Sequence, residues 1–449
     1  MAPDLGALPP VRPVSAAEVA RAIDGGPCVV VLDDDPTGTQ TVADVPVITG
    51  WSGADVRWGV RHPACYVLTN TRSLPAREAA DRNREVVRAL RTAGRDIVVA
   101  SRSDSTLRGH FPLETDVLAD ELGPIDGVVL APAYVEAGRV TLGATHWMRT
   151  PAGLVPVGET EFARDATFGY HSSDLREWVA EKTAGRIKPD QVLAVGIEDV
   201  RLGGPDHVAG LLSTLRDRQP VVVDAVCDDD LRVLALAIVR AEAAGTRLLY
   251  RVGPSFVRAR IGQAARDPLP GPESTGHGLI VAGSHVDLTT RQLAELRKLD
   301  GVREIELSAP AVLDPGTRGG HIADVAAAAA KALQHGDVVI RTSREVVRGN
   351  DGLAIAREVS SALVETVTAT AQAQRPAFVI AKGGITSSDI ATESLGIRRA
   401  IARGTLLPGI VSLWEPVGGP FAGMPYVVFA GNVGDEHSLA AVVEKLRSA

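Results

Sequence analysis

The chain has 449 residues, which at roughly 150 residues per domain allows two or three domains that each bury their own core. Hydrophobic residues make up 45% and charged residues 23%, which excludes disordered, collagen-like and coiled-coil chains. The net charge of −8 provides no basic field for a phosphate backbone or an anionic bilayer. We therefore expect neither nucleic acid nor a membrane as a partner.

The sequence also indicates where the protein is located and in which state its cysteines are. No stretch approaches the ~18 consecutive apolar residues of a membrane helix, and the opening MAPDLGALPPVRP lacks the apolar core of a signal peptide, so we expect a cytoplasmic protein. Cys28, Cys65 and Cys227 form no CxxC pair, and we interpret them as free thiols. Only six of the 47 Lys and Arg residues are lysines, so each lysine is an unusual choice.

Short β-branched runs alternate with longer helical patterns along the whole chain. This alternation indicates an α/β fold whose sheets are mostly parallel or mixed and are flanked by helices. Apolar residues at spacings of three and four predict helices such as Ala76–Thr92 and Asp229–Ala244. The predicted strands of the first half are Cys28–Leu32, Cys65–Thr69, Asp96–Ala100, Gly127–Ala131, Gln191–Val195, Pro220–Asp224 and Arg247–Val252.

The segment DPLPGPESTGHG, which begins at Asp267, interrupts this pattern with three prolines and three glycines in twelve residues. We interpret it as a linker and expect two domains, 1–270 and 271–449, with a small-molecule site in the cleft between them. Beyond it, predicted strands lie near Leu279 and Val302 and at Asp337–Arg341, Phe378–Ala381, Ile410–Leu413 and Tyr426–Phe429. The predicted helices are Asp324–Gln334, Leu353–Ala371 and Glu436–Leu446.

The first predicted strand runs directly into an acidic turn, LDDDPTGTQT, in which Asp33, Asp34 and Asp35 precede Pro-Thr-Gly. In open α/β sheets this end of the strands is where ligands bind. Adjacent carboxylates repel one another unless a cation, a hydroxyl-rich ligand or helix amides compensate. The pattern indicates either a ligand site or a solvated turn that caps a helix, and both readings stay open.

A second polar turn, SRSDSTLRGH at 101–110, follows the third predicted strand. Arginine binds carboxylates through two parallel hydrogen bonds, and Asp or Ser side chains bind hydroxyl groups. The turn therefore suits an anionic, polyhydroxylated ligand, with a helix cap and a surface ion pair as the alternative. Its polar residues include Arg102, Asp104, Ser105, Thr106 and Arg108.

Two further polar turns, TNTRSL from Thr69 and APAYVEAGRVTLGATHW from Ala131, follow other predicted strands. Because the carboxyl ends of parallel strands meet at one edge of a sheet, we expect all these turns to gather there. His110 and His146 lie within the turns, and contact with a ligand and a purely structural role are both open for them.

Three glycine-containing loops follow predicted strands in the second half: VAGSHV with Gly283 and Ser284, AKGGITSSD with Lys382, and FAGNVG with Gly431 and Asn432. Bare amides before a helix attract phosphate, and Lys382 could add a positive charge. Each loop alone is equally explained by a tight turn, but three in one domain favour phosphate binding. The chain has no GxxxxGK[ST], no GxGxxG at its first strand, no HExxH and no GxSxG.

The motifs DDPTG, SDSTLRG and APAYVEAGR, followed by GSH, KGGITSSD and GNVG, resemble the four-carbon acid sugar kinase family in order over nearly the whole chain. In that family the N-terminal domain binds a short sugar acid, the C-terminal domain binds ATP without a P-loop, and transfer occurs in the cleft. The resemblance implies an ATP-dependent kinase that uses Mg²⁺ in the catabolism of a sugar acid such as threonate, erythronate, 3-oxo-tetronate or 3-oxo-isoapionate. Many relatives read GGETS and GSCS where this chain reads GGITS and GSHV, so a Glu side chain is lost at Ile385.

The polar turns and the resemblance together predict the site residues. The expected catalytic residues are Asp34, Asp35 and Asp104. The expected substrate-binding residues are Thr37, Gly38, Asn70, Arg102, Ser105, Arg108, Gly138 and Arg139. The expected nucleotide-binding residues are Gly283, Ser284, Lys382, Gly383, Gly384, Ile385, Thr386, Gly431 and Asn432. The metal ligands, the role of the family-like segment Val155–Trp178, the sugar acid and a homo-oligomeric state are left open.

Two other functions fit parts of the pattern. A nicotinamide-dependent hydroxy-acid dehydrogenase would also use two α/β domains around a cleft, but the missing GxGxxG counts against it. A non-enzymatic sugar-acid binding protein could use the same polar turns without turnover. The bound nucleotide distinguishes the three functions, because it would be ATP, NAD(P) or none.

Overall fold

The chain forms two compact units, Met1–Arg266 and Asp267–Ala449. The computed structural model describes residues 3–151, 153–272, 275–283, 286–343 and 352–447. The boundary lies four residues before the expected one at 270/271, at the start of the Pro/Gly-rich segment. Within the described ranges, no helix is both long enough and apolar enough to cross a bilayer.

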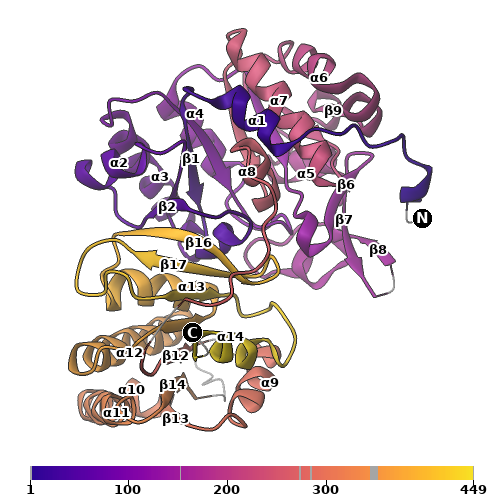
Figure 1. Ribbon diagram of the computed structural model, residues 1–449. Helices are drawn as coiled ribbons and strands as arrows, with labels where there is room; N and C mark the ends of the chain where they lie inside the picture. The colour runs from indigo at the N-terminus through magenta and orange to yellow at the C-terminus, as the bar shows by residue number, and fades with distance from the viewer. Residues whose placement is uncertain (1–2, 152, 273–274, 284–285, 344–351, 448–449) are drawn as a thin grey trace. The chain divides into compact units, whose positions relative to one another are not determined.

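The first unit, coloured from indigo to magenta in Figure 1, is built on a parallel sheet with the strand order β2-β3-β1-β4-β11-β5-β10-β9. Its register places Asp33 beside Leu68 on one side and beside Arg102 on the other, so three neighbouring strands end together. The strands are β1 (Cys28–Asp33), β2 (Val45–Ile48), β3 (Ala64–Leu68), β4 (Ile97–Arg102), β5 (Gly127–Ala131), β9 (Leu193–Val195), β10 (Gln219–Val223) and β11 (Leu248–Val252).

Helices enclose this sheet. Every residue of β1 is buried, as expected for a parallel strand covered on both faces. Alternate β1 residues, Cys28, Val30 and Leu32, pack in one apolar cluster with α2, α3 and α4. The helices are α1 (Ala16–Ile23), α2 (Gly53–Gly59), α3 (Ala76–Arg91), α4 (Leu113–Leu122), α5 (Leu175–Lys182), α6 (Gly204–Leu212), α7 (Asp228–Ala243) and α8 (Pro254–Arg260).

A small antiparallel sheet of β6 (Arg139–Leu142), β7 (Thr145–Thr150) and β8 (Gly153–Pro156) follows β5. Downstream of it, the short helices η5 (Val157–Glu159) and η6 (Glu161–Arg164) lead into α5. The segment is anchored by an apolar cluster in which Phe111 stacks on Trp178 at a centroid distance of 4.7 Å. Through this packing, η6 is held near the polar turn that precedes α4.

The second unit has a mixed sheet in the order β13-β14-β12-β15-β18-β17-β16. The strands from β13 to β18 in this order are parallel, and β17 and β16 are antiparallel. The strands are β12 (Leu279–Ala282), β13 (Val302–Leu307), β14 (Asp337–Thr342), β15 (Val379–Lys382), β16 (Arg399–Leu407), β17 (Val411–Pro416) and β18 (Tyr426–Phe429). The helices are α9 (Asp287–Leu296), α10 (Ala309–Leu313), α11 (Arg318–Ala332), α12 (Gly352–Ala373), α13 (Gly384–Asp389) and α14 (Ser438–Arg447).

The predicted α/β class and flanked sheets are confirmed, and the predicted strands correspond to β1, β3, β4, β5, β9–β15, β17 and β18. One placement was wrong. Arg102 belongs to β4 and not to the turn, because the ladder with Asp33 and Val252 extends to it. The strands β2, β6–β8 and β16 were missed. In β16, Ala and Gly occupy three of the inward positions, which hides the alternation that a strand pattern needs.

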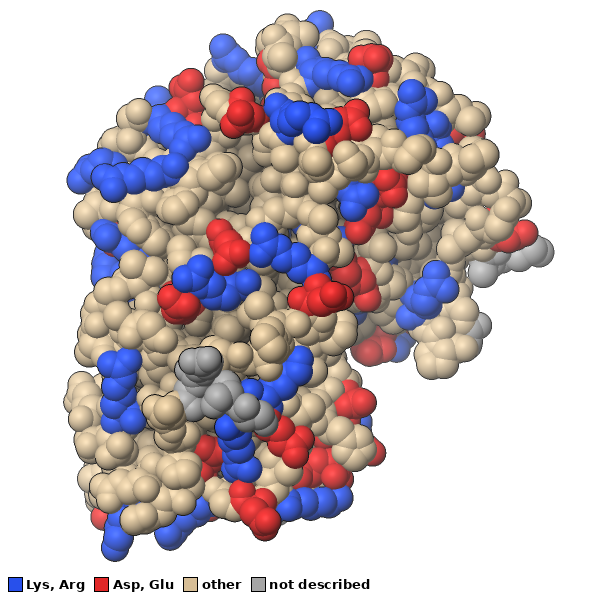
Figure 2. All heavy atoms as spheres, viewed as in Figure 1, with Lys and Arg blue, Asp and Glu red and all other residues tan. Residues whose placement is uncertain are grey.

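Charges of both signs are interspersed on the visible face in Figure 2. In the described residues many charged side chains are paired at short range, for example Arg297 with Glu304 at 2.7 Å and Arg318 with Glu365 at 2.5 Å. This face therefore carries no broad basic patch of the kind that binds a phosphate backbone.

Candidate active site

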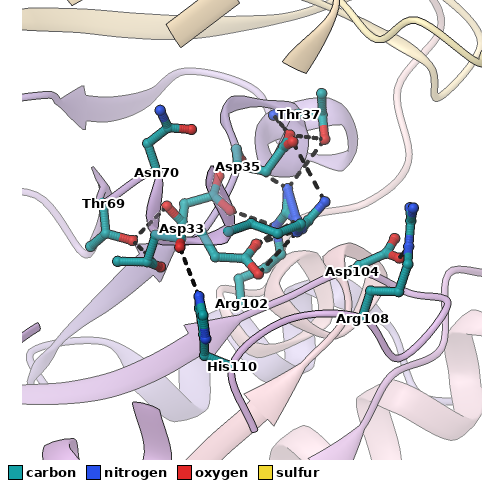
Figure 3. Close-up of polar contacts among 12 residues, drawn as sticks. Asp33, Asp35, Thr37, Thr69, Asn70, Arg102, Asp104, Arg108 and His110 are labelled. Carbon is teal, nitrogen blue, oxygen red and sulfur yellow. Dashed lines mark hydrogen bonds and ion pairs between the residues drawn. The ribbon is translucent and has the colours of Figure 1, made fainter. Parts of the chain in front are cut away.

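The acidic turn forms a compact charged centre at the carboxyl end of β1 (Figure 3). Arg72 donates from Nη2 to Asp34 Oδ1 at 2.6 Å and from Nε to Oδ2 at 3.2 Å. Arg102 places Nε 2.6 Å from Asp33 Oδ1, in an ion pair without hydrogen-bond alignment. We call these residues, with Asp35, Asp104 and Arg108, the aspartate centre.

Asp35 turns away from the strand and starts the next element. It caps the short helix η2 (Pro36–Thr41), where its Oδ1 accepts from the backbone amide of Thr37 at 2.8 Å and from Thr37 Oγ1 at 2.5 Å. Its side chain is 17% exposed, whereas those of Asp33 and Asp34 are 2% exposed. Asp35 is therefore the member of the acidic turn that a ligand can reach.

Gly38 is the residue that allows the ion pair between Asp33 and Arg102 to form. A Cβ at position 38 would lie within 3.0 Å of Asp33 Oδ2 and of Arg102 Nε, closer than side chains approach. Gly109 has a similar role at φ +122°, because a Cβ there would lie 3.0 Å from Asp34 Oδ2. Both glycines of the predicted motifs therefore make room for buried charge.

The three carboxylates of the acidic turn have different proton affinities. Burial raises the pKa of Asp33 to about 8, and the charges of Asp34 and Asp35 add to the rise while Arg102 opposes it. Burial also raises the pKa of Asp34, against the opposing pull of Arg72 and Arg102. For Asp35, burial is outweighed by the two arginines and the Thr37 hydrogen bonds, which hold its pKa below the usual range. Asp35 is thus ionised at neutral pH.

Asp104 and Arg108 extend the centre from the turn after β4. Arg108 donates from Nε to Asp104 Oδ2 at 2.6 Å, and Thr106 Oγ1 donates to the same oxygen. Burial is outweighed by Arg108 and Arg72, which hold the pKa of Asp104 well below its usual range. The Arg108 side chain is 23% exposed and Asp104 is 14% exposed, so both are accessible to a ligand.

Phe162 on η6 adjoins two of the three arginines predicted to bind the substrate, Arg108 and Arg139. The guanidinium carbon of Arg108 lies 5.0 Å from the ring centroid, and that of Arg139 lies 6.0 Å from it. Arg139 is also 5.9 Å from the Tyr134 ring, and its buried Nε has no hydrogen-bond partner among the described residues. Asp165, just after η6, lies 3.4 Å from Arg108 Nη1.

A second buried layer supports the centre from below. Glu114 on α4 accepts from Arg251 Nη1 at 2.6 Å and from Thr71 Oγ1 at 2.5 Å. Arg251 also donates to Ser101 Oγ at 2.7 Å, which links β11 to β4. A buried pair of this kind is stable only when its remaining polar atoms are satisfied, as they are here. This layer fixes the backbone on which Arg72 and Arg102 stand.

Three other residues predicted to bind the substrate, Asn70, Ser105 and Gly138, lie in different environments. Asn70 has a left-handed backbone at φ 50°, and its side-chain amide bonds to no described residue. Ser105 is buried, and its carbonyl bonds His146 Nε2 at 2.8 Å. Gly138, also left-handed, lies against Arg149, where a Cβ would be 2.8 Å from its Cβ. Asn70 is thus open to a ligand.

The two histidines of the polar turns have structural partners. His146 is fully buried between Thr141 and Ser105, and burial lowers its pKa to about 4. His110, labelled in Figure 3, places Nε2 2.9 Å from the Leu74 carbonyl and 3.1 Å from the Thr71 carbonyl. His146 therefore stays neutral and anchors the turn around Ser105.

In the second unit, three loops meet at the carboxyl ends of the neighbouring strands β12, β15 and β18. We call them the glycine loops: Gly283, Gly383–Thr386 and Ala430–Asn432. A Cβ on Gly283 would lie 2.6 Å from Thr386 Oγ1, so the first two loops are in contact. Thr289 on α9 donates to the Gly431 carbonyl at 3.2 Å, and Asn432 is exposed. Ser284, also predicted here, lies outside the described residues.

The side chains of the Gly383–Thr386 loop differ sharply in exposure. Lys382 is fully buried at the end of β15, and Ile385 is 54% exposed. Gly383 adopts φ +121° and donates its amide to the Phe429 carbonyl at 2.8 Å. The first-turn amides of α13 follow, and such amides lack intrahelical acceptors. The loop thus offers backbone donors and one apolar side chain to solvent.

Comparison with known proteins gives the context of both centres. One family model, the sugar-binding N-terminal domain, matches residues 29–260, and a second, the nucleotide-binding C-terminal domain, matches residues 279–439. The chain belongs to the four-carbon acid sugar kinase family. In the family's terms, the aspartate centre lies in the sugar-binding domain and the glycine loops lie in the nucleotide-binding domain.

Relatives of this four-carbon acid sugar kinase family member cover nearly the whole chain. A D-erythronate kinase from Heliobacterium modesticaldum is 24% identical over 93% of this chain and 97% of the relative. A D-threonate kinase from Bordetella bronchiseptica is 27% identical over 94% and 98%. A solved structure from Salmonella typhimurium LT2 has a TM-score of 0.69 over 92% of this chain and 98% of that one, at 20% identity, which shows the fold alone.

Sequence reasoning did not single out two residues of the family's sugar-binding domain that the structure brings to the site. Arg72 lies in the polar turn TNTRSL, and its bidentate bond to Asp34 could have been anticipated from the excess of acids in the facing turn. Phe162 belongs to the segment Val155–Trp178, to which no role was assigned. Only its contacts with Arg108 and Arg139 distinguish it, and nothing in its sequence neighbourhood signals them.

Proposed function

We propose that this protein transfers the γ-phosphoryl group of ATP to a hydroxyl group of a small, four-carbon or similar, sugar acid. The observation that carries the proposal is the accessible part of the aspartate centre. There, Arg108, Asp104 and Asp35 lie at the carboxyl ends of parallel strands, where α/β folds bind ligands. Cations, carboxylates and the unbonded Asn70 amide together match a ligand with one carboxylate and several hydroxyl groups.

Arg108 is the better candidate for the substrate carboxylate. Arg102 is 3% exposed and is already shared among Asp33, Asp34 and the Asp35 carbonyl. Arg108 keeps 23% of its side chain exposed, and Arg139 beside it has an unpaired Nε. We therefore assign Arg108, with Arg139, to the carboxylate end, and Asp104 and Asn70 to the hydroxyl groups.

Asp35 has the properties of the group that orients the attacking hydroxyl and accepts its proton. It is ionised, partly exposed, and has one oxygen committed to Thr37 while Oδ2 lies 3.5 Å from Arg72 Nη1. In phosphoryl transfer the acceptor acts late, so alignment matters more than basicity. Asp34, by contrast, is enclosed by Arg72 and Arg102, and its role is to hold them in place.

The glycine loops are assigned to the nucleotide. The amides in the first turn of α13, within the Gly383–Thr386 loop, supply donors for phosphate oxygens. Gly283 lies so close to Thr386 that a side chain would not fit between the two loops. Among the residues that the structure describes, no three His, Cys, Asp or Glu side chains form a metal cage. Mg²⁺ that arrives with the nucleotide is held mainly by phosphate oxygens and water, and it needs only one or two protein carboxylates. Bound there, the ion would neutralise charge on the β and γ oxygens.

An ADP-release assay tests the proposal. The full chain is incubated with Mg·ATP and a panel of four- and five-carbon sugar acids, including 3-oxo forms, while NAD(P)H absorbance is read in parallel. ADP release that depends on one acid supports the kinase and names its substrate. A nicotinamide signal without ADP release would replace it by a hydroxy-acid dehydrogenase, and acid binding without either signal would indicate a binding protein.

A further inference from the structure

Lys382 is one of six lysines in the chain, and its side chain is fully buried. It is the last residue of β15, paired in register with Phe429 on β18. Nζ lies 3.8 Å from the centroid of the Phe429 ring and donates to the Ala430 carbonyl at 2.6 Å. The ammonium group is thus held between an aromatic face and one backbone oxygen.

This environment is unusual for a lysine. Within the described part of the chain, Lys382 has no carboxylate partner, and the Ala430 carbonyl is its hydrogen-bond acceptor. Burial lowers the pKa of Lys382 to about 7, because the interior disfavours the charged form. An apolar side chain would fill the same space without this cost. The hydrogen bond to the Ala430 carbonyl, however, requires a long side chain with a donor at its end.

The hydrogen bond between Lys382 and Ala430 lies just beyond the end of the β15–β18 pairing. The amide of Gly383 bonds the Phe429 carbonyl at 2.8 Å and forms the last rung of the β15–β18 ladder. The Lys382 side chain adds one more link beyond that rung, to Ala430. Lys382 directly precedes the Gly383–Thr386 loop, and Ala430 is the first residue of the Ala430–Asn432 loop. The bond therefore joins the bases of two glycine loops.

We propose that Lys382 is a positioning residue that fixes the spacing of the Gly383–Thr386 and Ala430–Asn432 loops from beneath. It acts on the nucleotide through the loop backbone and not as a charge on the phosphates. The proposal rests on the assignment of these loops to the nucleotide. A loop pair held at fixed spacing presents its amides ready for phosphate, which lowers the ordering cost of binding.

The test compares Lys382→Met and Lys382→Gln in the full chain. Met has similar length and removes an unpaired buried charge, so the variant should fold with an unchanged or higher Tm. Gln keeps a neutral donor on a slightly shorter side chain. Lys445→Met is the control, since Lys445 also donates to two carbonyls of the second unit, Leu269 and Leu406, but at a distance in sequence from the loops.

Amide hydrogen exchange of the nucleotide-free protein is the primary measurement. In Lys382→Met we expect faster exchange in peptides covering the two loops and no change in the first unit. ATP affinity should fall roughly tenfold, the size expected for one lost hydrogen bond from a charged donor, with the KM of the acid unchanged. Lys382→Gln should recover part of both losses, and Lys445→Met should change neither.

Unchanged loop exchange in Lys382→Met would overturn the proposal, whether or not ATP affinity falls. Equal ATP loss in the Met and Gln variants would also overturn it, because it would assign the role to the charge itself. A wild-type chain that binds no adenine nucleotide would refute the proposed function instead. The exchange measurement separates these failures, since it needs no nucleotide.

Discussion

In the first unit, each carboxylate of the aspartate centre has an arginine partner, whereas in the second unit the glycine loops present backbone donors, and Lys382, which directly precedes one of them, is buried. Arg72, Arg102 and Arg108 are within 3.5 Å of the aspartates that they neutralise. Among the described residues, the ammonium group of Lys382 bonds the Ala430 carbonyl and contacts the Phe429 ring, and it pairs with no carboxylate. The aspartate centre thus obtains its polarity from side chains, and the glycine loops obtain theirs from backbone groups.

This difference has a consequence for mutation. A centre made of paired side chains is sensitive to the loss of a single charge, because the partner is left buried and uncompensated. A centre made of backbone amides tolerates side-chain changes but depends on loop geometry. The following variants test whether the first unit behaves as the first kind.

Asp34→Asn should have the largest effect. The variant keeps the shape of the side chain but leaves Arg72 and Arg102 with one carboxylate fewer. The two arginines are then no longer held in place beside Asp35. We expect kcat/KM for the acid to fall by about 10²–10⁴-fold, with ATP affinity unchanged. Steady-state kinetics and ATP titration measure the two quantities.

The control for Asp34→Asn is Asp81→Asn. Asp81 pairs with Arg84 at 2.9 Å on α3, but both side chains are exposed, and such pairs contribute little. Its kinetics should match the wild type. Sugar-acid kinase activity in Asp34→Asn at the level of this control would remove the acidic turn from the active site.

Gly38→Ala tests whether the charged pair needs the empty space beside it. The added methyl group would lie within 3.0 Å of Asp33 Oδ2 and Arg102 Nε, so the pair must separate. We expect a loss of about 1–3 kcal/mol in the free energy of unfolding and at least a tenfold loss of kcat/KM. Urea unfolding and the ADP-release assay measure these changes.

Gly210→Ala is the matched control in the same unit. Gly210 lies in α6, and a Cβ there would meet no atom within 4 Å. Alanine in an exposed helix should stabilise the protein by roughly 0.5–1 kcal/mol. If Gly38→Ala proved as harmless as this variant, the close approach of the ion pair to Gly38 would not matter for stability.

Much of the architecture could be predicted from the sequence. Buried parallel strands such as CVVVL at β1 and GVVLA at β5 have continuous β-branched runs, and their ends carry the polar turns. The strand β16 could not be found, because its inward positions include Ala400, Ala402 and Gly404 and its hydrophobic alternation is weak. The small sheet β6–β8 was missed, in part because its longest strand, β7, has the sequence THWMRT, which mixes polar and apolar types without a period.

The site was less predictable than the fold. The sequence identified the acidic turn and SDSTLRG, but it could not distinguish Arg102, which is buried under the aspartates, from Arg108, which is accessible. That distinction depends on where β4 ends, which is two residues beyond the predicted boundary at Ala100. Lys382 shows the same limit, since a lysine beside two glycines suggests a phosphate contact and its burial becomes visible only in the fold.

Phe162→Leu tests the aromatic contact that the sequence did not reveal. Loss of the ring removes its contacts with Arg108 and Arg139, each worth about 0.5–1 kcal/mol at an accessible site. We expect the KM of the acid to rise about two- to fivefold while the KM of ATP stays unchanged. Phe162→Tyr keeps the aromatic face and should behave like the wild type. An equal rise in both variants would show that volume, and not the ring face, is what matters at this position.

The smallest expected effect concerns pH and compares two neighbouring aspartates. Burial raises the pKa of Asp33 to about 8, above its unfolded value of about 3.9. Between these values the folded protein keeps a proton that the unfolded chain has lost, so this residue's contribution to stability declines as pH rises from about 4 to 8. Asp35 has the opposite shift, and its contribution is lost only as pH falls below about 4.

Tm measured from pH 5 to pH 9 separates the two aspartates. Asp33→Asn mimics the protonated side chain, so its Tm should gain on the wild type with rising pH and level off above about 8. Asp35→Asn should lower Tm by a similar amount throughout this range, because Asp35 is ionised in both states. Parallel curves for wild type and Asp33→Asn would mean that Arg102, at 2.6 Å, keeps Asp33 ionised despite its burial. In that case Asp33 would add one more charge to the aspartate centre, and the contrast with the uncharged glycine loops would be sharper still.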